Sequence, residues 1–246
     1  MDSQGAEPDL LDKPLTDEPK ILTEIKTVYG FFSQLRCISL VGDKVFWICG
    51  SDKIMRLYNI RCELLKTTKT KAGNMPEDIA VIRNNELVYT DDKEETINVL
   101  IKNNSQIQTV ISLHGWKPLG VCSTFSGDLL VIIESDDKQT KIVHYSAFTE
   151  KQSIQYDDKG QPLFSYDGTK YISENRNLDI CVSDFGANAV VVVNKDGEHR
   201  FTYNGLPSSI MECFRPINIT TDRDFRNGLN STANCKRMIY AHVTIR

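Results

Sequence analysis

A pattern of two apolar runs separated by a short polar gap recurs along this chain, and it constrains the fold more than any other feature. The clearest copy is DICVSDFGANAVVVV (Asp179–Val193), and three others lie at Val45–Tyr58, Glu86–Ile101 and Asp128–Tyr145. The first run of each copy stops at a small or acidic residue, and successive stops are 41, 43 and 50 residues apart: Gly50, Asp91, Glu134 and Asp184. Short strands at such a period predict the blades of a β-propeller.

Each copy is flanked by two further strand-like segments. Three upstream segments begin with proline, at Pro76, Pro118 and Pro216, and proline is tolerated at the first residue of a strand. Downstream, a more polar run such as HRFTY (His199–Tyr203) follows an Asp-Gly pair, which is a hairpin signal. Each unit therefore predicts four antiparallel strands. We expect an all-β propeller with about four complete blades and the start of a fifth, incomplete relative to a six-bladed ring.

Asp184 ends the apolar run ICVSD and precedes a turn. A carboxylate at the end of a strand readily accepts hydrogen bonds from the backbone N–H groups of the turn that follows. We therefore expect a structural role for Asp184, not a catalytic one.

Bulk properties narrow the range of partners. The chain has 246 residues and a formal net charge of −4 at pH 7, so no global field draws it to DNA or to an anionic membrane. It contains no apolar run of the roughly 20 residues that span a bilayer, and its first residues are acidic where a signal peptide is basic. These features predict a cytoplasmic protein that binds neither membrane nor DNA.

Neither metal nor cofactor binding is expected from the motifs present. The seven cysteines are scattered, and the four histidines make no ligand pair, whereas closed zinc sites have local Cys/His spacing. The chain contains no nucleophile elbow, no phosphate-binding loop and no dinucleotide fingerprint. The acidic doublets Asp91-Asp92, Asp136-Asp137 and Asp157-Asp158 are better explained as solvated turns than as paired catalytic carboxylates. The sequence therefore predicts a protein that is not an enzyme.

Four stretches carry a resemblance to a known family: GDLLVIIES, EKQSIQYDDKGQPL, ISENRNLDICVSDFGANAVVVVNKDGEHRFTYNG and FRPINITTD. They resemble the NHL-type β-propellers of the tripartite-motif-like family of bivalve molluscs, over roughly residues 25–222. The resemblance implies a scaffold that recognises a protein partner or a substrate for ubiquitin ligation. Relatives often carry a RING finger, B-boxes and a coiled coil. This chain lacks their zinc spacing and heptads, so we do not expect it to transfer ubiquitin itself.

The pattern divides the chain into three parts. Residues 1–20 read as a disordered acidic arm, residues 21–222 as the NHL-like propeller, and residues 223–246 as an aberrant or truncated tail. Within the tail, only MIYAHVTI alternates like a strand, with Ile239, Ala241, Val243 and Ile245 on one side.

The predicted strand order places the links between blades on one face, where a partner would bind. These links contain AGNMPED, LHGWKPL and CFRPIN, and they supply four candidate contact residues: Asn74, Trp116, Lys117 and Arg215. Trp116 has two equally supported roles, because an exposed indole is a common binding hot spot and a buried one fills the space between blades.

A basic segment, KIMRLYNIRCELLKTTKTK, supports an alternative function. It holds six bases against one acid, and the bases are Lys53, Arg56, Arg61, Lys66, Lys69 and Lys71. Some propellers of the resembled type bind RNA through a basic face, so these are the possible RNA contacts. Strand alternation places Arg56 on the opposite face from Met55 and Leu57, and this face is expected to be solvated. A solvated strand edge therefore explains the basic segment better than RNA binding does.

Overall fold

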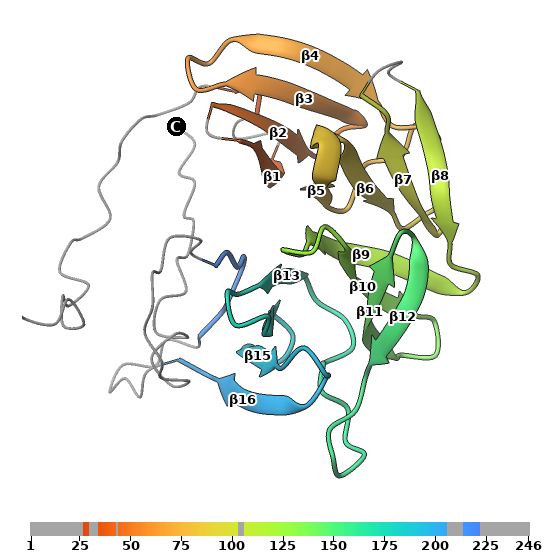
Figure 1. The fold of residues 1–246 in the computed structure, drawn as a ribbon, viewed down its shortest axis with the longest axis vertical. Coiled ribbons are helices and arrows are strands. Elements are labelled where there is room, and N and C mark those ends of the chain that lie inside the picture. Colours follow the sequence, from red (N-terminus) through yellow and green to blue (C-terminus); the bar gives the residue numbers. More distant parts are fainter. Residues whose placement is uncertain (1–26, 30–33, 43, 103–105, 206–213, 222–246) are drawn as a thin grey trace, which may run out of the picture.

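Four antiparallel sheets of four strands each make up the part of the chain that this computed structural model describes (Figure 1). It describes residues 27–29, 34–42, 44–102, 106–205 and 214–221. Blade 1 contains β1 (Leu35–Val41), β2 (Val45–Gly50), β3 (Ile54–Asn59) and β4 (Leu64–Lys69). Blade 2 contains β5 (Ile79–Val81), β6 (Leu87–Asp91), β7 (Thr96–Leu100) and β8 (Ile107–Ser112), with one 3₁₀ turn at Arg83–Asn85.

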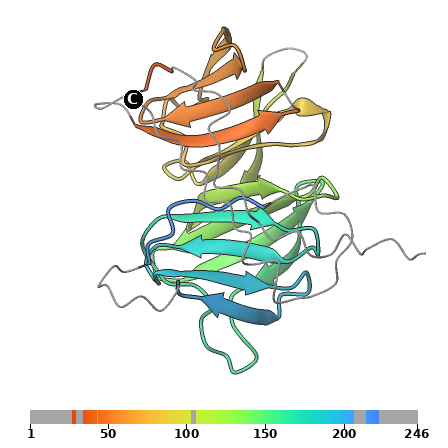
Figure 2. The same cartoon turned by 90° about the vertical axis from the view of Figure 1, so that its left-hand side faces the viewer.

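The other two blades repeat the same order. Blade 3 contains β9 (Trp116–Ser123), β10 (Leu129–Ser135), β11 (Thr140–Ser146) and β12 (Thr149–Ile154). Blade 4 contains β13 (Lys170–Glu174), β14 (Ile180–Asp184), β15 (Ala189–Val193) and β16 (His199–Tyr203). The first strands, β1, β5, β9 and β13, lie nearest the centre, and the sheets lie face against face when seen from the side (Figures 1 and 2).

This architecture confirms the predicted all-β propeller with four complete blades. The opening motif forms β14 and β15, as the repeat predicts, and HRFTY forms β16. Segment 214–221 contains no strand, yet Ile219 packs on blade 4 with Cys181, Val190 and Val192, at the place of a following blade. The proposed acidic arm and the proposed aberrant tail lie outside the described residues.

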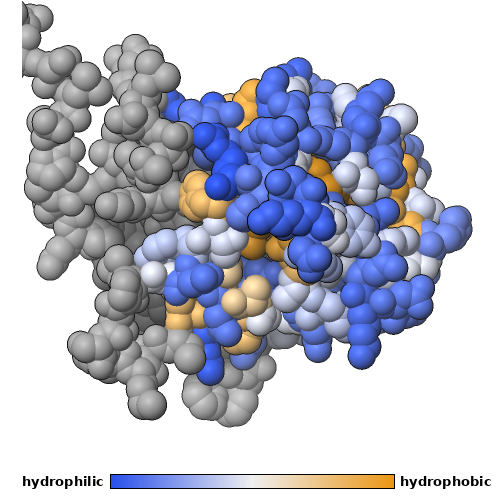
Figure 3. Space-filling view, turned by 90° about the horizontal axis from the view of Figure 1, so that it is seen from below, coloured by the Kyte–Doolittle hydropathy of each residue, from blue (hydrophilic) through white to orange (hydrophobic). Residues whose placement is uncertain are grey.

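Apolar clusters between blades hold the propeller together. One cluster joins blades 1 and 2, a second joins blades 2 and 3, and a third joins blades 3 and 4. β15 is AVVVV and is buried at every position, because a central strand of a blade is covered on both faces. The outer strands β4, β12 and β16 are more exposed, and the surface in Figure 3 is mostly hydrophilic with small apolar patches.

Carboxylates at the ends of second strands accept backbone hydrogen bonds, as expected for Asp184. Asp184 accepts hydrogen bonds from the N–H groups of Ala187 (3.0 Å) and Ser165 (2.7 Å). Asp91 accepts from the N–H groups of Lys93 and Glu94. The sequence predicts that Asp91 is a solvated turn residue, but the structure buries it fully. Its carboxylate also accepts a hydrogen bond from the side-chain amide of Asn74.

Four hairpins share one five-residue turn, which we call the capped turn; the copies are 59–63, 157–161, 175–179 and 194–198. The first residue is Asn or Asp, and its side-chain oxygen accepts the N–H groups of the third and fifth residues at 2.7–3.0 Å. The fourth residue has a positive φ. Gly160 and Gly197 adopt this conformation without strain, whereas Cys62 and Leu178 adopt it despite a Cβ atom.

Candidate functional site: a polar pocket at the centre of the propeller

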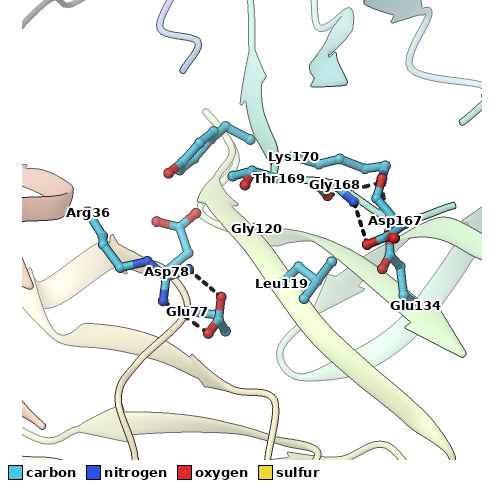
Figure 4. A pocket seen from close by; sticks show the side chains of 11 residues that line it. Arg36, Glu77, Asp78, Leu119, Gly120, Glu134, Asp167, Gly168, Thr169 and Lys170 are labelled. Atoms are coloured by element: carbon cyan, nitrogen blue, oxygen red, sulfur yellow. Dashed lines mark hydrogen bonds and ion pairs between the residues drawn. The ribbon is translucent and has the colours of Figure 1, made fainter. Parts of the chain in front are cut away.

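A cavity of about 290 Å³ lies where the first strands of the blades begin, and all four blades contribute to its wall (Figure 4). This arrangement follows from the fold, because each link from one blade to the next delivers its last residues to the same end of the central axis. The lining residues are Arg36, Glu77, Asp78, Leu119, Gly120, Glu134, Asp167, Gly168, Thr169, Lys170 and Tyr171.

The first ion pair in the wall joins blade 1 to blade 2. The Arg36 guanidinium donates two hydrogen bonds to the Glu77 carboxylate, from Nη1 to Oε1 at 3.1 Å and from Nη2 to Oε2 at 2.6 Å. The two side chains are 25% and 19% exposed. A bidentate pair of this kind is geometrically specific as well as attractive, so it fixes the position of both side chains at the rim of the cavity.

A second ion pair joins blade 3 to blade 4. Lys170 Nζ lies 2.7 Å from Glu134 Oε1 and also donates to the carbonyl oxygens of Asp167 (2.9 Å) and Gly168 (3.3 Å). The Lys170 side chain is completely buried. A buried ammonium group needs such compensation, so Lys170 organises the Asp167–Lys170 loop around itself.

Asp78 lies between the two pairs and is buried (Figure 4). Its Oδ1 accepts the N–H of Ile79 at 2.8 Å, and its Oδ2 accepts the N–H of Val121, in blade 3, at 2.9 Å. Burial raises the pKa of this carboxyl group to about 6, against the lowering effect of the two backbone hydrogen bonds.

Gly120 allows the close approach of β9 and β13 at the cavity wall. A Cβ atom at this position would lie 3.0 Å from the Lys170 carbonyl oxygen and 3.3 Å from Ile132 Cδ1. Any larger residue would therefore push the two first strands apart and change the shape of the cavity.

The charge of the pocket favours a cation. The two ion pairs each sum to zero, which leaves Asp78 and the exposed Asp167 without a matching base among the lining residues. Two nearby acids in the loops between second and third strands are already paired, Asp92 with Lys93 and Asp136 with Lys117. The excess negative charge therefore belongs to the lining residues themselves, and a concave site with excess carboxylates concentrates positive charge from solution.

Of the four predicted partner-binding residues, Asn74 lies in the link before β5, Trp116 and Lys117 begin β9, and Arg215 lies in segment 214–221. Asn74 donates from Nδ2 to Asp91 Oδ1 at 3.1 Å. Trp116 is half-buried against the core between blades 2 and 3, with Lys141 Nζ 4.3 Å from the centre of its ring. Lys117 forms an ion pair with Asp136 at 2.5 Å, and Arg215 is exposed in segment 214–221.

The basic segment is distributed along the outer part of blade 1. Lys53, Arg61, Lys69 and Lys71 are exposed, and Lys66 is half-exposed. The solvated position predicted for Arg56 is wrong: this residue is only 9% exposed, and its guanidinium bonds to Asp52 and to the Tyr29 hydroxyl, each at 2.6 Å. Tyr29 precedes the first strand, so the alternation of residues along β3 could not predict that Tyr29 covers the Arg56 side chain.

Sequence reasoning missed the pocket residues themselves. Glu77 and Asp78 stand inside the recognised segment PEDIAV, and Lys170 begins β13. A usable signal was present: charged residues at the starts of first strands must meet around the axis once the fold is a propeller. Among the residues that the structure describes, no group of His, Cys, Asp or Glu is arranged to hold a metal, and no helix is long and apolar enough to cross a membrane.

Comparison with solved structures places this fold among known propellers. The nidogen/laminin complex matches with a TM-score of 0.60 and 14% identity, over 77% of this chain and 69% of that chain. Virginiamycin B lyase from Staphylococcus aureus matches with a TM-score of 0.53 and 12% identity, over 77% and 60%. A gluconolactonase from Xanthomonas campestris matches with a TM-score of 0.54 and 14% identity, over 73% and 62%. This chain thus covers less than two thirds of either enzyme.

These comparisons show the propeller fold and correct one prediction. No family model and no curated protein matches the chain, so the resemblance to the tripartite-motif-like family is supported only at the level of the fold. The prediction that the chain is not an enzyme is wrong as drawn, because structures of this fold include a lyase and a gluconolactonase. A propeller gathers its site from several blades, as the pocket here shows, so missing contiguous motifs do not exclude catalysis.

Proposed function

We propose that this chain is a recognition propeller that binds a basic segment of a protein partner at its central pocket. The observation that carries the proposal is the pocket itself, in which side chains from all four blades surround a space of about 290 Å³ with an excess of carboxylates. A lysine or arginine side chain has the charge, the length and the narrow stem that such a space accommodates.

The partner segment reaches the pocket across the link before β5 and the start of β9. Asn74, Trp116 and Lys117 lie beside the pocket residues Glu77 and Leu119 along the chain, so an extended peptide that inserts one basic side chain also crosses these residues. Asp167 is exposed, and within the described part of the chain its Oδ2 receives no hydrogen bond. It is therefore the first carboxylate that an incoming ammonium or guanidinium group meets.

Selection from a phage-displayed random peptide library tests this function. We expect wild-type protein to enrich peptides that contain Lys or Arg, and we expect Asp167→Asn to bind the selected peptides about five- to tenfold more weakly, as the loss of one charged contact implies. Asp158→Asn removes an exposed carboxylate away from the pocket and serves as the matched control. Selected peptides without basic residues, or equal affinity for both variants, would overturn the proposal.

The proposal includes a second step, in which the bound partner is a substrate for ubiquitin ligation. Its support is the resemblance over residues 25–222, so it needs its own experiment. Cells that express the chain should contain more ubiquitinated forms of a captured partner than cells that express Asp167→Asn. Equal ubiquitination in both would leave a binding module without this role.

Single-stranded RNA is the second candidate ligand. It is favoured by the exposed bases Lys53, Lys69 and Lys71. Lys69 pairs with Ile54 at the end of the β3–β4 ladder, and Lys53 directly precedes Ile54. The burial of Arg56 removes one of the six expected contacts. RNA would occupy the outer part of blade 1 and not the acidic pocket, so the two functions make separate predictions.

A further inference from the structure

Two aromatic side chains of blade 4 are exposed beside the central pocket, and we call them the aromatic rim. Tyr166 directly precedes Asp167 in the loop that leads into β13, and Phe185 begins the turn between β14 and β15. The two residues are 41% and 37% exposed. Exposed aromatic side chains beside a pocket are typical of a binding surface.

Backbone contacts hold Phe185 against the wall of the pocket. Its N–H donates to the carbonyl oxygen of Thr169 at 3.2 Å, and Thr169 lines the pocket. A Cβ atom on Gly168, another lining residue, would lie 3.0 Å from the nitrogen of Gly186 and 3.8 Å from Phe185 Cδ1. Because position 168 has no side chain, the turn approaches closely and the Phe185 ring lies beside Gly168.

The same loop carries the exposed carboxylate of the pocket. Asp167 Oδ1 accepts the N–H of Gly168 at 2.9 Å, whereas Oδ2 accepts no hydrogen bond within the described ranges of the chain. Asp167 lines the pocket, and its neighbour Tyr166 belongs to the aromatic rim. An available carboxylate oxygen and exposed aromatic rings therefore adjoin one another at a single loop.

The rings of the aromatic rim carry no cation among the residues that the structure describes. By contrast, Lys141 Nζ lies 4.3 Å from the centre of the Trp116 ring, at the start of β9. No lysine or arginine of the described segments covers Tyr166 or Phe185 in this way. The Trp116 ring is thus already in use, and the two rings of blade 4 are accessible to a cation from a partner.

We infer that the basic residue selected by the pocket is an arginine, which pairs with the Asp167 carboxylate and stacks on the aromatic rim; this inference rests on the proposed function. A guanidinium group is planar and donates its hydrogen bonds in that plane. One arginine therefore bonds a carboxylate at its edge while its flat face contacts an aromatic ring. The ammonium group of lysine is a compact, strongly hydrated charge and gains less from the ring.

Titration of the full chain with two capped amino acids tests the inference. The probes are N-acetylarginine amide and N-acetyllysine amide, and NMR shifts of the amides of residues 165–170 report binding. The wild type should bind the arginine probe about three- to fivefold more tightly, as a cation–π contact at an exposed ring implies. Tyr166→Leu with Phe185→Leu keeps apolar volume without π faces and should abolish this preference.

Two matched controls accompany these variants. Tyr166→Phe with Phe185→Tyr retains both aromatic faces and should retain the preference for arginine. Phe125→Leu removes an aromatic residue that is 50% exposed in the turn between β9 and β10, at the opposite ends of these strands from the pocket, and should also retain it. If the double leucine variant does not fold, Phe185→Leu alone decides and should lower the preference about twofold or more.

The outcomes separate this inference from the proposed function. Equal affinity of the wild type for both probes, with both weakened by Asp167→Asn, would overturn the arginine preference and leave the acidic pocket as a general site for basic residues. A preference that persists in the double leucine variant would also overturn the inference, because the aromatic rim would then not be its source. Failure of both probes to bind would overturn the inference and the proposed function together.

Discussion

The Asp78 carboxylate accepts a hydrogen bond from the N–H of Val121 at 2.9 Å, across the boundary between blades 2 and 3. Its other oxygen accepts the N–H of Ile79, so one buried acid positions the first strands of two adjacent blades. Because the group is both buried and structural, its protonation is linked to the stability of the fold.

We predict that the contribution of Asp78 to the free energy of unfolding falls as pH rises from about 4 to 7. Burial raises the Asp78 pKa to about 6 from 3.8, so in this interval the folded protein binds the proton more strongly than the unfolded chain does. The contribution is fully present below pH 4 and is lost above pH 6, and it is on the order of 3 kcal/mol.

Urea denaturation at several pH values measures this effect. The difference in stability between wild type and Asp78→Asn should change with pH, since the variant lacks the titrating group. Exposed Asp158→Asn is the control and should follow the wild type. A constant difference between wild type and Asp78→Asn over the whole range would contradict the prediction.

The Arg36–Glu77 pair should show strong thermodynamic coupling. We expect Arg36→Ala and Glu77→Ala each to cost about 1–3 kcal/mol, because either change leaves a half-buried charge without its bidentate partner. The double variant should cost less than the sum of the two, with a coupling energy of about 0.5–3 kcal/mol. Additive losses in a double-mutant cycle would show that the pair contributes little.

Leu178→Gly should stabilise the protein. Leu178 is the fourth residue of a capped turn, has a φ of 63° and is 40% exposed, so removal of its side chain relieves strain and loses little burial. We expect a gain of about 0.5–1 kcal/mol. Gly197→Ala, at the same turn position with a φ of 90°, should lose stability, and thermal unfolding that shows the opposite signs would refute the strain argument.

Trp116→Ala should lower stability by roughly 2–3 kcal/mol, since the indole packs on the core between blades 2 and 3 and lies under Lys141. Lys141→Ala should lower it by only about 0.5–1 kcal/mol. The alternative role of Trp116, as a binding anchor, predicts instead that Trp116→Ala binds the selected basic peptides more weakly at an unchanged melting temperature.

RNA binding has its own signature. If the outer bases of blade 1 contact phosphates, the affinity for single-stranded RNA should fall steeply with salt, and Lys53→Ala with Lys69→Ala should reduce the slope by about two phosphate contacts. The same double variant should leave peptide binding at the pocket unchanged. Undetectable RNA binding at low salt would eliminate this function.

The blades could be predicted from the sequence because their signal is local. The runs that form β10 and β14 are mostly apolar and carry an acid at or next to their last residue, Glu134 and Asp184, and a period of 40–50 residues admits few folds. The pocket could not be predicted in this way, since Arg36 and Lys170 are far apart in the sequence and line one cavity only because four blades are arranged around it. Arg56 was mispredicted for a similar reason. Alternation predicts which face of the strand a side chain is on, but it does not predict which other residues cover that face.

The contacts around the pocket also connect all four blades to one another. Arg36–Glu77, Asp78–Val121 and Glu134–Lys170 each cross a different boundary, so together they tie blade 1 to 2, 2 to 3 and 3 to 4. A ligand that fills the space between them resists the splaying of all three boundaries at once. Binding at the centre should therefore stiffen the molecule against mechanical pulling from its rim.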